Sequence, residues 1–171
     1  MSRLSVHGSN LEKIAIARLF TPGPVPIHDH ILKIGAQQPP YNRTQEFSDF
    51  TCEILDNLRY VFQTKGDVAI LSASGTAAME ASVLNFAVDC NKVLIINGGT
   101  FGQRWVDLCT VFSIDFEEIR LDPGQLLDMD ELEECLKEGD FSALFATAHE
   151  TSTGFLLDVQ QIGELTRRHK V

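Results

Sequence analysis

Three short apolar runs separated by helical patterns constrain the fold of this sequence more than any other feature. The runs cover residues 68–72, 93–97 and 143–147, and a helical pattern follows each of them. Strands that are apolar throughout are typical of a parallel sheet covered on both faces, because the side chains on each face then meet helices. The sequence therefore predicts an α/β fold: a three-layer α/β/α arrangement with a mainly parallel sheet.

The remaining elements follow from the same periodicities. Apolar spacing predicts helices at 44–62, 75–88, 102–112, 129–137 and 159–170. The 75–88 helix is apolar nearly all round and is expected to be buried. The more polar run 116–121 predicts an edge strand. Ligands of such sheets bind beyond the carboxyl ends of the strands, so the loops beginning at Ser72, Asn97 and Thr147 are the candidate sites.

Three regions are expected along the chain. Residues 1–20 form an arm, with a short helix starting at Ser9 or Asn10. Residues 21–62 combine a proline-rich stretch at 21–26, which allows neither helix nor sheet, with the first long helix. Residues 63–171 carry the strand–helix alternation and form the beginning of a large domain.

Composition narrows the class of protein. With 171 residues, 44% hydrophobic and 22% charged, the chain reads as a soluble globular domain. The net charge of -10 argues against nucleic acid or an anionic membrane as partner, although backbone dipoles can still bind a small anion. Without a membrane span or a signal peptide, a cytoplasmic location is expected.

Neither a metal site nor a disulfide framework is expected. The four cysteines lack the spacing of either and are predicted to be reduced thiols. His28, Asp29 and His30 have no third spaced ligand and are predicted to be solvated surface.

The first candidate loop, Ser-Ala-Ser-Gly-Thr at 72–76, runs directly into a helix. Its small residues let a ligand approach the backbone, and the first-turn N–H groups can hold an anion with help from the hydroxyls of Ser74 and Thr76. An ordinary serine N-cap explains the same residues equally well. The pattern alone leaves both interpretations open.

The other two loops are also unusual. The loop at 97–104 (NGGTFGQR) places Phe101 between glycines, where its ring can stack on a flat ligand or fill the core, and the pattern slightly favours the core. The loop at 149–154 (HETSTG) carries a carboxylate and three hydroxyls. That capacity for hydrogen bonds exceeds what a tight turn requires and indicates a polar ligand.

Taken together, these segments resemble the class V aminotransferases of pyridoxal phosphate (PLP) fold type I. This is the group of alanine–glyoxylate, serine–pyruvate and 2-aminoethylphosphonate transaminases. The matching segments occur in the family's order: TPGPVP at 21–26, YVFQT at 60–64, SASGTAAMEA at 72–81, GTFGQR at 99–104 and HETSTG at 149–154. The resemblance implies the front part of the family's large domain and a pyridoxal 5'-phosphate cofactor.

The resemblance also assigns roles to residues. One segment matches the phosphate-binding helix start, an aromatic residue matches the one stacked on the pyridine ring, and a hydroxyl matches the one that bonds the ring's phenolic oxygen. In that order they are Ser74, Gly75 and Thr76, then Phe101, then Thr151. A second set matches the lip of the substrate pocket near the interface of a homodimer: Pro22, Gly23 and Pro24.

The activity implied is transfer of an amino group from a small amino acid to a 2-oxo acid such as glyoxylate or pyruvate. In the family, an aspartate for the pyridine nitrogen, the Schiff-base lysine and a substrate-binding arginine follow the segment matched here. None of the six lysines of this chain lies in the matching context, so no catalytic residue is assigned and the chain alone is expected to be inactive. The alternatives are another class V PLP enzyme, a desulfurase or lyase, or a non-catalytic phosphate-binding or dimerisation fragment.

The family's strand order has a further consequence. It implies that residues 68–72 do not pair with residues 93–97 within this chain. Their backbone groups then need another partner, and the chain alone is expected to be prone to aggregation.

Overall fold

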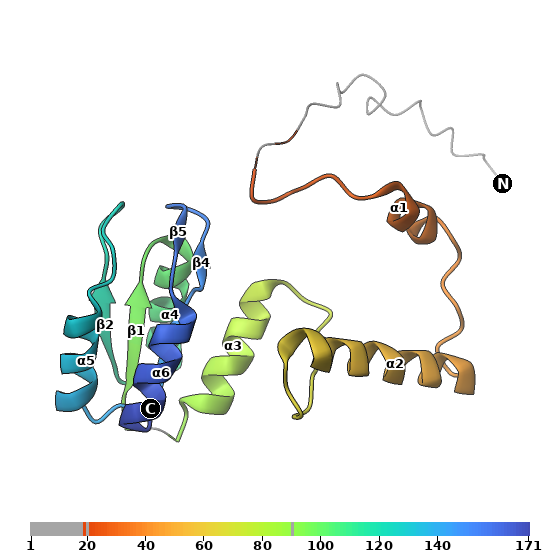
Figure 1. Cartoon of the computed structure of the whole chain (residues 1–171). Coiled ribbons are helices and arrows are strands. Elements are labelled where there is room, and N and C mark those ends of the chain that lie inside the picture. Colours follow the sequence, from red (N-terminus) through yellow and green to blue (C-terminus); the bar gives the residue numbers. More distant parts are fainter. Residues whose placement is uncertain (1–18, 20, 90) are drawn as a thin grey trace. The chain divides into compact units, whose positions relative to one another are not determined.

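The structure, a computed structural model, describes residues 19, 21–89 and 91–171 (Figure 1). The chain divides into two units, residues 1–65 and 66–171. The helix expected from Ser9 or Asn10 lies outside the described residues. The expected division into an arm, a loop-and-helix segment and a large domain stays a prediction.

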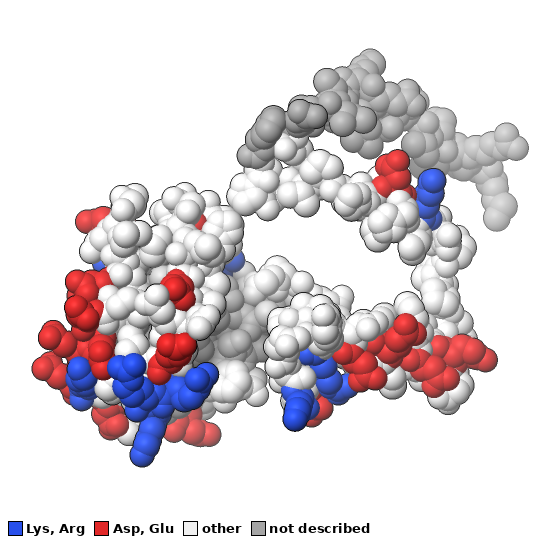
Figure 2. Space-filling model, in the orientation of Figure 1, with Lys and Arg blue, Asp and Glu red and all other residues white. Residues whose placement is uncertain are grey.

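The first unit contains two helices. α1 spans Asp29–Gly35 and α2 spans Gln45–Phe62. Thr44 caps the first turn of α2, because its hydroxyl accepts a bond from the Phe47 N–H at 3.2 Å. Residues 21–26 form neither helix nor strand, as expected. α1 was not expected, because seven residues between proline-rich segments give too short a period to recognise. Acidic side chains line the exposed face of α2 (Figure 2).

The second unit is built on a parallel sheet. Its strands are β1 (Val93–Asn97), β2 (Phe116–Arg120) and β3 (Ala143–Ala146), in the order β2-β1-β3. The expectation of an edge strand at 116–121 is confirmed. A small antiparallel hairpin, β4 (His149–Glu150) and β5 (Phe155–Leu156), follows β3.

Helices cover both faces of this sheet. α3 (Gly75–Phe86) and α4 (Thr100–Val111) lie on one face, and α5 (Met129–Glu138) and α6 (Val159–His169) lie on the other (Figure 1). Side chains of β1 alternate between the two layers: Val93 and Ile95 pack with α3 and α4, whereas Leu94 and Ile96 pack with α5 and α6. Burial of such a side chain contributes roughly 1.5–3 kcal/mol. The predicted three-layer α/β/α fold is confirmed.

Two expectations about the start of this unit are wrong. Residues 68–72 form no strand, because no strand of the described residues lies beside them to complete a ladder. Their failure to pair with β1 is as expected. α3 is not buried: only Val83 is, while Leu84 and Phe86 are 43% and 65% exposed. α3 meets the sheet with one side, and none of the described residues of its unit buries the other side.

Several smaller expectations can be checked on the described residues. His28, Asp29 and His30 are exposed, and no group of three or more metal-ligating side chains occurs in the described part of the chain. Cys52, Cys109 and Cys135 are unpaired, and Cys90 lies outside the described residues. None of the described helices is long and apolar enough to cross a membrane.

Candidate cofactor site

The second and third candidate loops are joined by the carboxylate of Glu150. This residue is 1% exposed, and its Oε2 accepts bonds from the Phe101 and Gly102 N–H groups at 2.9 and 2.8 Å. Its Oε1 accepts bonds from the N–H and hydroxyl of Ser152 at 3.2 and 2.6 Å. Glu150 therefore satisfies the first turn of α4, where free N–H groups and the helix dipole favour a negative charge.

The hydrogen bonds of Glu150 keep it ionised. Burial raises the pKa of the carboxyl. The bonds from Ser152, Gly102 and Phe101 lower it by more than burial raises it, so the net pKa lies below the ordinary value. A buried carboxylate with this many donors is a structural anion. The negative charge that α4 attracts is thus supplied by the protein itself.

The polar groups of the third loop have different partners. Ser152 Oγ accepts a bond from the Thr100 N–H at 3.0 Å, and the Thr153 hydroxyl donates to the Gly98 carbonyl at 3.1 Å. Glu150 is occupied as well, so most of the capacity assigned to a polar ligand serves α4 instead. The Thr151 side chain is exposed and makes no hydrogen bond with the described residues. Of the four polar side chains at 150–153, Thr151 is the one available to a ligand.

The start of α3 differs from the starts of the other long helices. Side chains cap the first turns of α2, α4, α5 and α6: Thr44, Glu150, Asp128 and Asp158. Ser74, the N-cap of α3, makes no such bond, and no other described side chain accepts from this turn. A Cβ at Gly75 would meet nothing within 4 Å. The Ala77 N–H donates to the Ser74 carbonyl at 3.0 Å, whereas no described group accepts from the N–H groups of Gly75 and Thr76. This favours the anion site over the ordinary serine cap.

Arg104 connects the first loop to the second. Its Nη1 donates to the Thr76 hydroxyl at 2.9 Å, and its guanidinium carbon lies 5.0 Å from the centroid of the Phe101 ring. Phe101 is half-buried and belongs to neither core cluster, so it does not fill the core as the pattern slightly favoured. No role was predicted for Arg104 from the sequence. In the sequence, its place in the GTFGQR segment was the one feature that could have pointed to such a role.

The structure thus brings part of the predicted set together. Arg104 links Thr76 to Phe101, and Glu150, which directly precedes Thr151, accepts a bond from the backbone N–H of Phe101. Pro22, Gly23 and Pro24 are exposed residues of the first unit. The assignment of all eight residues to cofactor and substrate stays a prediction.

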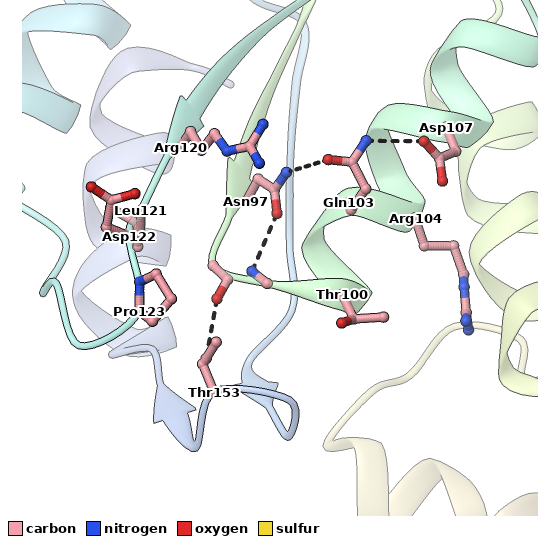
Figure 3. Close-up of a pocket in the computed structure, with 12 residues that line it drawn as sticks. Asn97, Thr100, Gln103, Arg104, Asp107, Arg120, Leu121, Asp122, Pro123 and Thr153 are labelled. Carbon is pink, nitrogen blue, oxygen red and sulfur yellow. Dashed lines mark hydrogen bonds between the residues drawn. The ribbon is translucent and has the colours of Figure 1, made fainter.

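A separate polar cavity opens between the carboxyl ends of β1 and β2 (Figure 3). It measures about 460 Å³, and Asn97 on its wall donates to Gln103 Oε1 and Glu118 Oε1 at 3.1 and 2.7 Å. None of the five predicted cofactor residues lines it. Arg104 reaches its rim, but Figure 3 shows the side chain pointing away from Arg120 and Asp122. This cavity and the predicted cofactor residues therefore lie in different places.

Among known proteins, the chain is similar to aminotransferases in both sequence and structure. The alanine–glyoxylate aminotransferase of Felis catus is 31% identical over 152 residues, which cover 88% of this chain and 37% of that protein. The solved alanine–glyoxylate aminotransferase from Nostoc sp. is 29% identical with a TM-score of 0.79, over 97% of this chain and 46% of that one. The chain is homologous to the alanine–glyoxylate group of aminotransferases of PLP fold type I.

The homology to these aminotransferases confirms the resemblance found in the sequence, including its restriction to the amino-terminal part. No protein-family model matches the chain. Two relatives are named as subunits of a soluble hydrogenase. The 42 kDa subunit of Anabaena cylindrica is 36% identical over 154 residues, covering 88% of this chain and 40% of that protein. The small subunit of Synechococcus sp. is 33% identical over 156 residues, covering 90% of this chain and 41% of that protein. The chain spans about two fifths of the length of the curated relatives it matches.

Proposed function

We propose that this chain forms the phosphate-binding part of the PLP site of an aminotransferase. The observation that carries the proposal is the uncapped start of α3, whose Thr76 is held by Arg104 beside an aromatic ring. A phosphate dianion binds well at free N–H groups with a positive helix end behind them. The homology supports the choice of PLP among ligands that carry a phosphate.

The five residues have distinct roles in this proposal. The N–H groups of the first turn of α3 and the hydroxyls of Ser74 and Thr76 hold the phosphate, and the absence of a side chain at Gly75 leaves room for it. Phe101 stacks on the pyridine ring, and Thr151 donates to its phenolic oxygen. Glu150 keeps these two residues in register, because it bonds the N–H of Phe101 and adjoins Thr151.

The bound cofactor would supply an electron sink for the carbanion formed at the amino acid's α-carbon. The residues of this chain would bind and orient that ring. We propose that the intact protein transfers an amino group from a small amino acid to a 2-oxo acid such as glyoxylate or pyruvate, as a cytoplasmic homodimer. Pro22, Gly23 and Pro24 would form the lip of its substrate pocket.

The chain by itself is proposed to bind without transaminating, because none of its six lysines lies in the family's Schiff-base context. A desulfurase or lyase of the same fold would use the same phosphate site. A hydrogenase-subunit role, which the name of the Anabaena relative suggests, would require no such site. Binding of a B6 phosphate therefore separates the last possibility from the others.

The test compares two B6 vitamers that cannot form imines with lysines, pyridoxine 5'-phosphate and pyridoxine. Titration followed by calorimetry should show that the phosphate ester binds the chain about tenfold tighter or better, since bonds to charged groups contribute about 1.5–3 kcal/mol. Gly75→Leu should remove most of this preference with little change in melting temperature, because its Cβ enters open space.

Gly163→Leu is the matched control, because Gly163 lies in α6 and its Cβ would also meet nothing within 4 Å. It should leave the preference for the phosphate ester intact. Equal affinity of the unmodified chain for both vitamers, or an unchanged preference in Gly75→Leu, contradicts the proposed function.

A further inference from the structure

Arg104 bridges two helices of the second unit through its side chain. This half-buried residue in the second turn of α4 reaches Thr76 at the start of α3, which lies 28 positions earlier in the chain. Figure 3 shows the side chain leaving α4 on the side opposite to Arg120. A surface arginine would keep its guanidinium in water, so an ordered contact between two helices requires a reason.

The bond to Thr76 determines which way that hydroxyl can donate. A threonine hydroxyl has one O–H and two lone pairs. When a lone pair accepts from Arg104 Nη1 at 2.9 Å, the O–H must point elsewhere, toward a second acceptor. Accepting from a cation also makes the hydroxyl a stronger donor. Thr76 is therefore prepared to donate to an anion at the start of α3.

The guanidinium also adds charge where the helix start alone would supply only a partial one. A helix end carries about half an elementary charge, whereas a phosphate monoester carries nearly two negative charges at neutral pH. Arg104 keeps its full charge at any physiological pH. Among the described residues, its side chain contacts Thr76 and Phe101, and no carboxylate forms an ion pair with it.

The contact with Phe101 constrains where a flat ligand can stack. The guanidinium lies over the ring at 5.0 Å from its centroid and covers one of its two faces. A ligand ring can then stack only on the other face. A single side chain thus sets the orientation of the hydroxyl donor and the free face of the aromatic residue.

We infer that Arg104 is a positioning residue of the proposed phosphate site, which orients Thr76 as a donor and supplies positive charge beside the phosphate. The inference rests on the proposed function. It concerns a residue of α4 that acts on a ligand at α3 through Thr76. Its signature is a contribution specific to the phosphate group, since a residue that merely holds the two helices together would affect phosphorylated and unphosphorylated ligands alike.

The experiment measures the ratio of the dissociation constants of pyridoxine and pyridoxine 5'-phosphate in the full chain. Arg104→Gln should lower this ratio about fivefold, because it removes one charge-assisted interaction while the N–H groups of α3 remain. Arg104→Lys keeps the charge but loses the planar guanidinium, so its ratio should lie between those of the unmodified chain and Arg104→Gln. Arg120→Gln changes net charge equally at an exposed position and should leave the ratio unchanged.

A double-mutant cycle tests whether Arg104 acts through Thr76. Thr76→Val should lower the ratio, and adding Arg104→Gln to it should lower the ratio by clearly less than the product of the two single effects. Thr76→Val also serves if Arg104→Gln fails to fold. A ratio near one in the unmodified chain refutes the proposed function. A large ratio that Arg104→Gln leaves within about twofold, or independent effects in the cycle, refutes the role of Arg104 and leaves the proposed function standing.

Discussion

Glu150 shows how a residue can look like a ligand-binding group and serve the fold. Its carboxylate replaces the anion that the first turn of α4 would otherwise attract, with bonds to Phe101 and Gly102 of 2.9 and 2.8 Å. From the sequence, a carboxylate beside three hydroxyls after a buried strand indicates a ligand site. Only the tertiary structure shows that α4 begins beside it.

We predict that Glu150→Gln destabilises the second unit by about 2 kcal/mol at pH 7, since an amide cannot accept all four bonds and loses the charge. The folded pKa of Glu150 is lowered, so its stabilising effect is present above its unfolded value of about 4.3 and is lost as the pH falls through the folded value. Urea unfolding at several pH values measures both effects.

In that series, the difference between Glu150→Gln and the unmodified chain should shrink below about pH 4.3, where the carboxylate of the unfolded chain becomes protonated. Glu80→Gln, at an exposed position of α3, should match the unmodified chain throughout. A constant difference from pH 7 to pH 3 would show that the charge of Glu150 does not matter.

At the scale of elements, the sequence predicts what depends on local pattern and misses what depends on distant partners. β1, α5 and α6 agree with the prediction within a residue or so, because their apolar periods are complete within each segment. α4 begins at Thr100 instead of residue 102, since Ser152 and Glu150, about fifty positions away, bond its first turn. Residues 68–72 have the composition of a strand, but composition cannot supply the neighbouring strand.

Replacing two helical glycines by alanine should change the stability of the second unit in opposite directions. A Cβ at Gly102 would lie 2.6 Å from Asn97 Oδ1 and 2.8 Å from Asn97 Cα, so α4 passes the end of β1 too closely for any side chain. Gly102→Ala should therefore cost about 1–3 kcal/mol of unfolding free energy. Gly163→Ala in α6 meets open space and should stabilise by about 0.5–1 kcal/mol. Chemical denaturation of both variants checks the pair, and equal effects would contradict the close approach at Gly102.

For the whole molecule, the sequence could identify the loops of the site but not how they connect. Parallel strands place their carboxyl ends at one edge, which predicts that the loops after β1 and β3 meet, and they do through Glu150. The link from the start of α3 to α4 depends on one side chain, Arg104, whose bonds span 28 positions. Periodicity carries no information about such a contact. The roles proposed for Thr76 and Phe101 come from the resemblance, and the contact of Arg104 with both comes from the geometry.

The edge of β3 that faces away from β1 is open in the described part of the chain. Within the described residues β3 pairs only with β1, and an apolar groove beside it is lined by Phe86, Leu144, Val159 and Ile162. An open strand edge with an apolar flank favours association, so we expect residues 1–171 to form oligomers with a second copy covering this groove.

Val159→Glu should reduce that association, because it places a charge in the groove at a residue that is 57% exposed. The change should not unfold α6, since a carboxylate in the first turn of a helix is favourable. Sedimentation velocity at several concentrations measures the effect, with circular dichroism to check the helix content. Leu126→Glu adds the same charge at a residue that is 76% exposed and outside the groove, so it should leave the oligomers intact. A monomeric, cooperatively melting unmodified chain would show that the open edge is harmless, and an equal loss of oligomers in both variants would show that net charge, and not the groove, controls association.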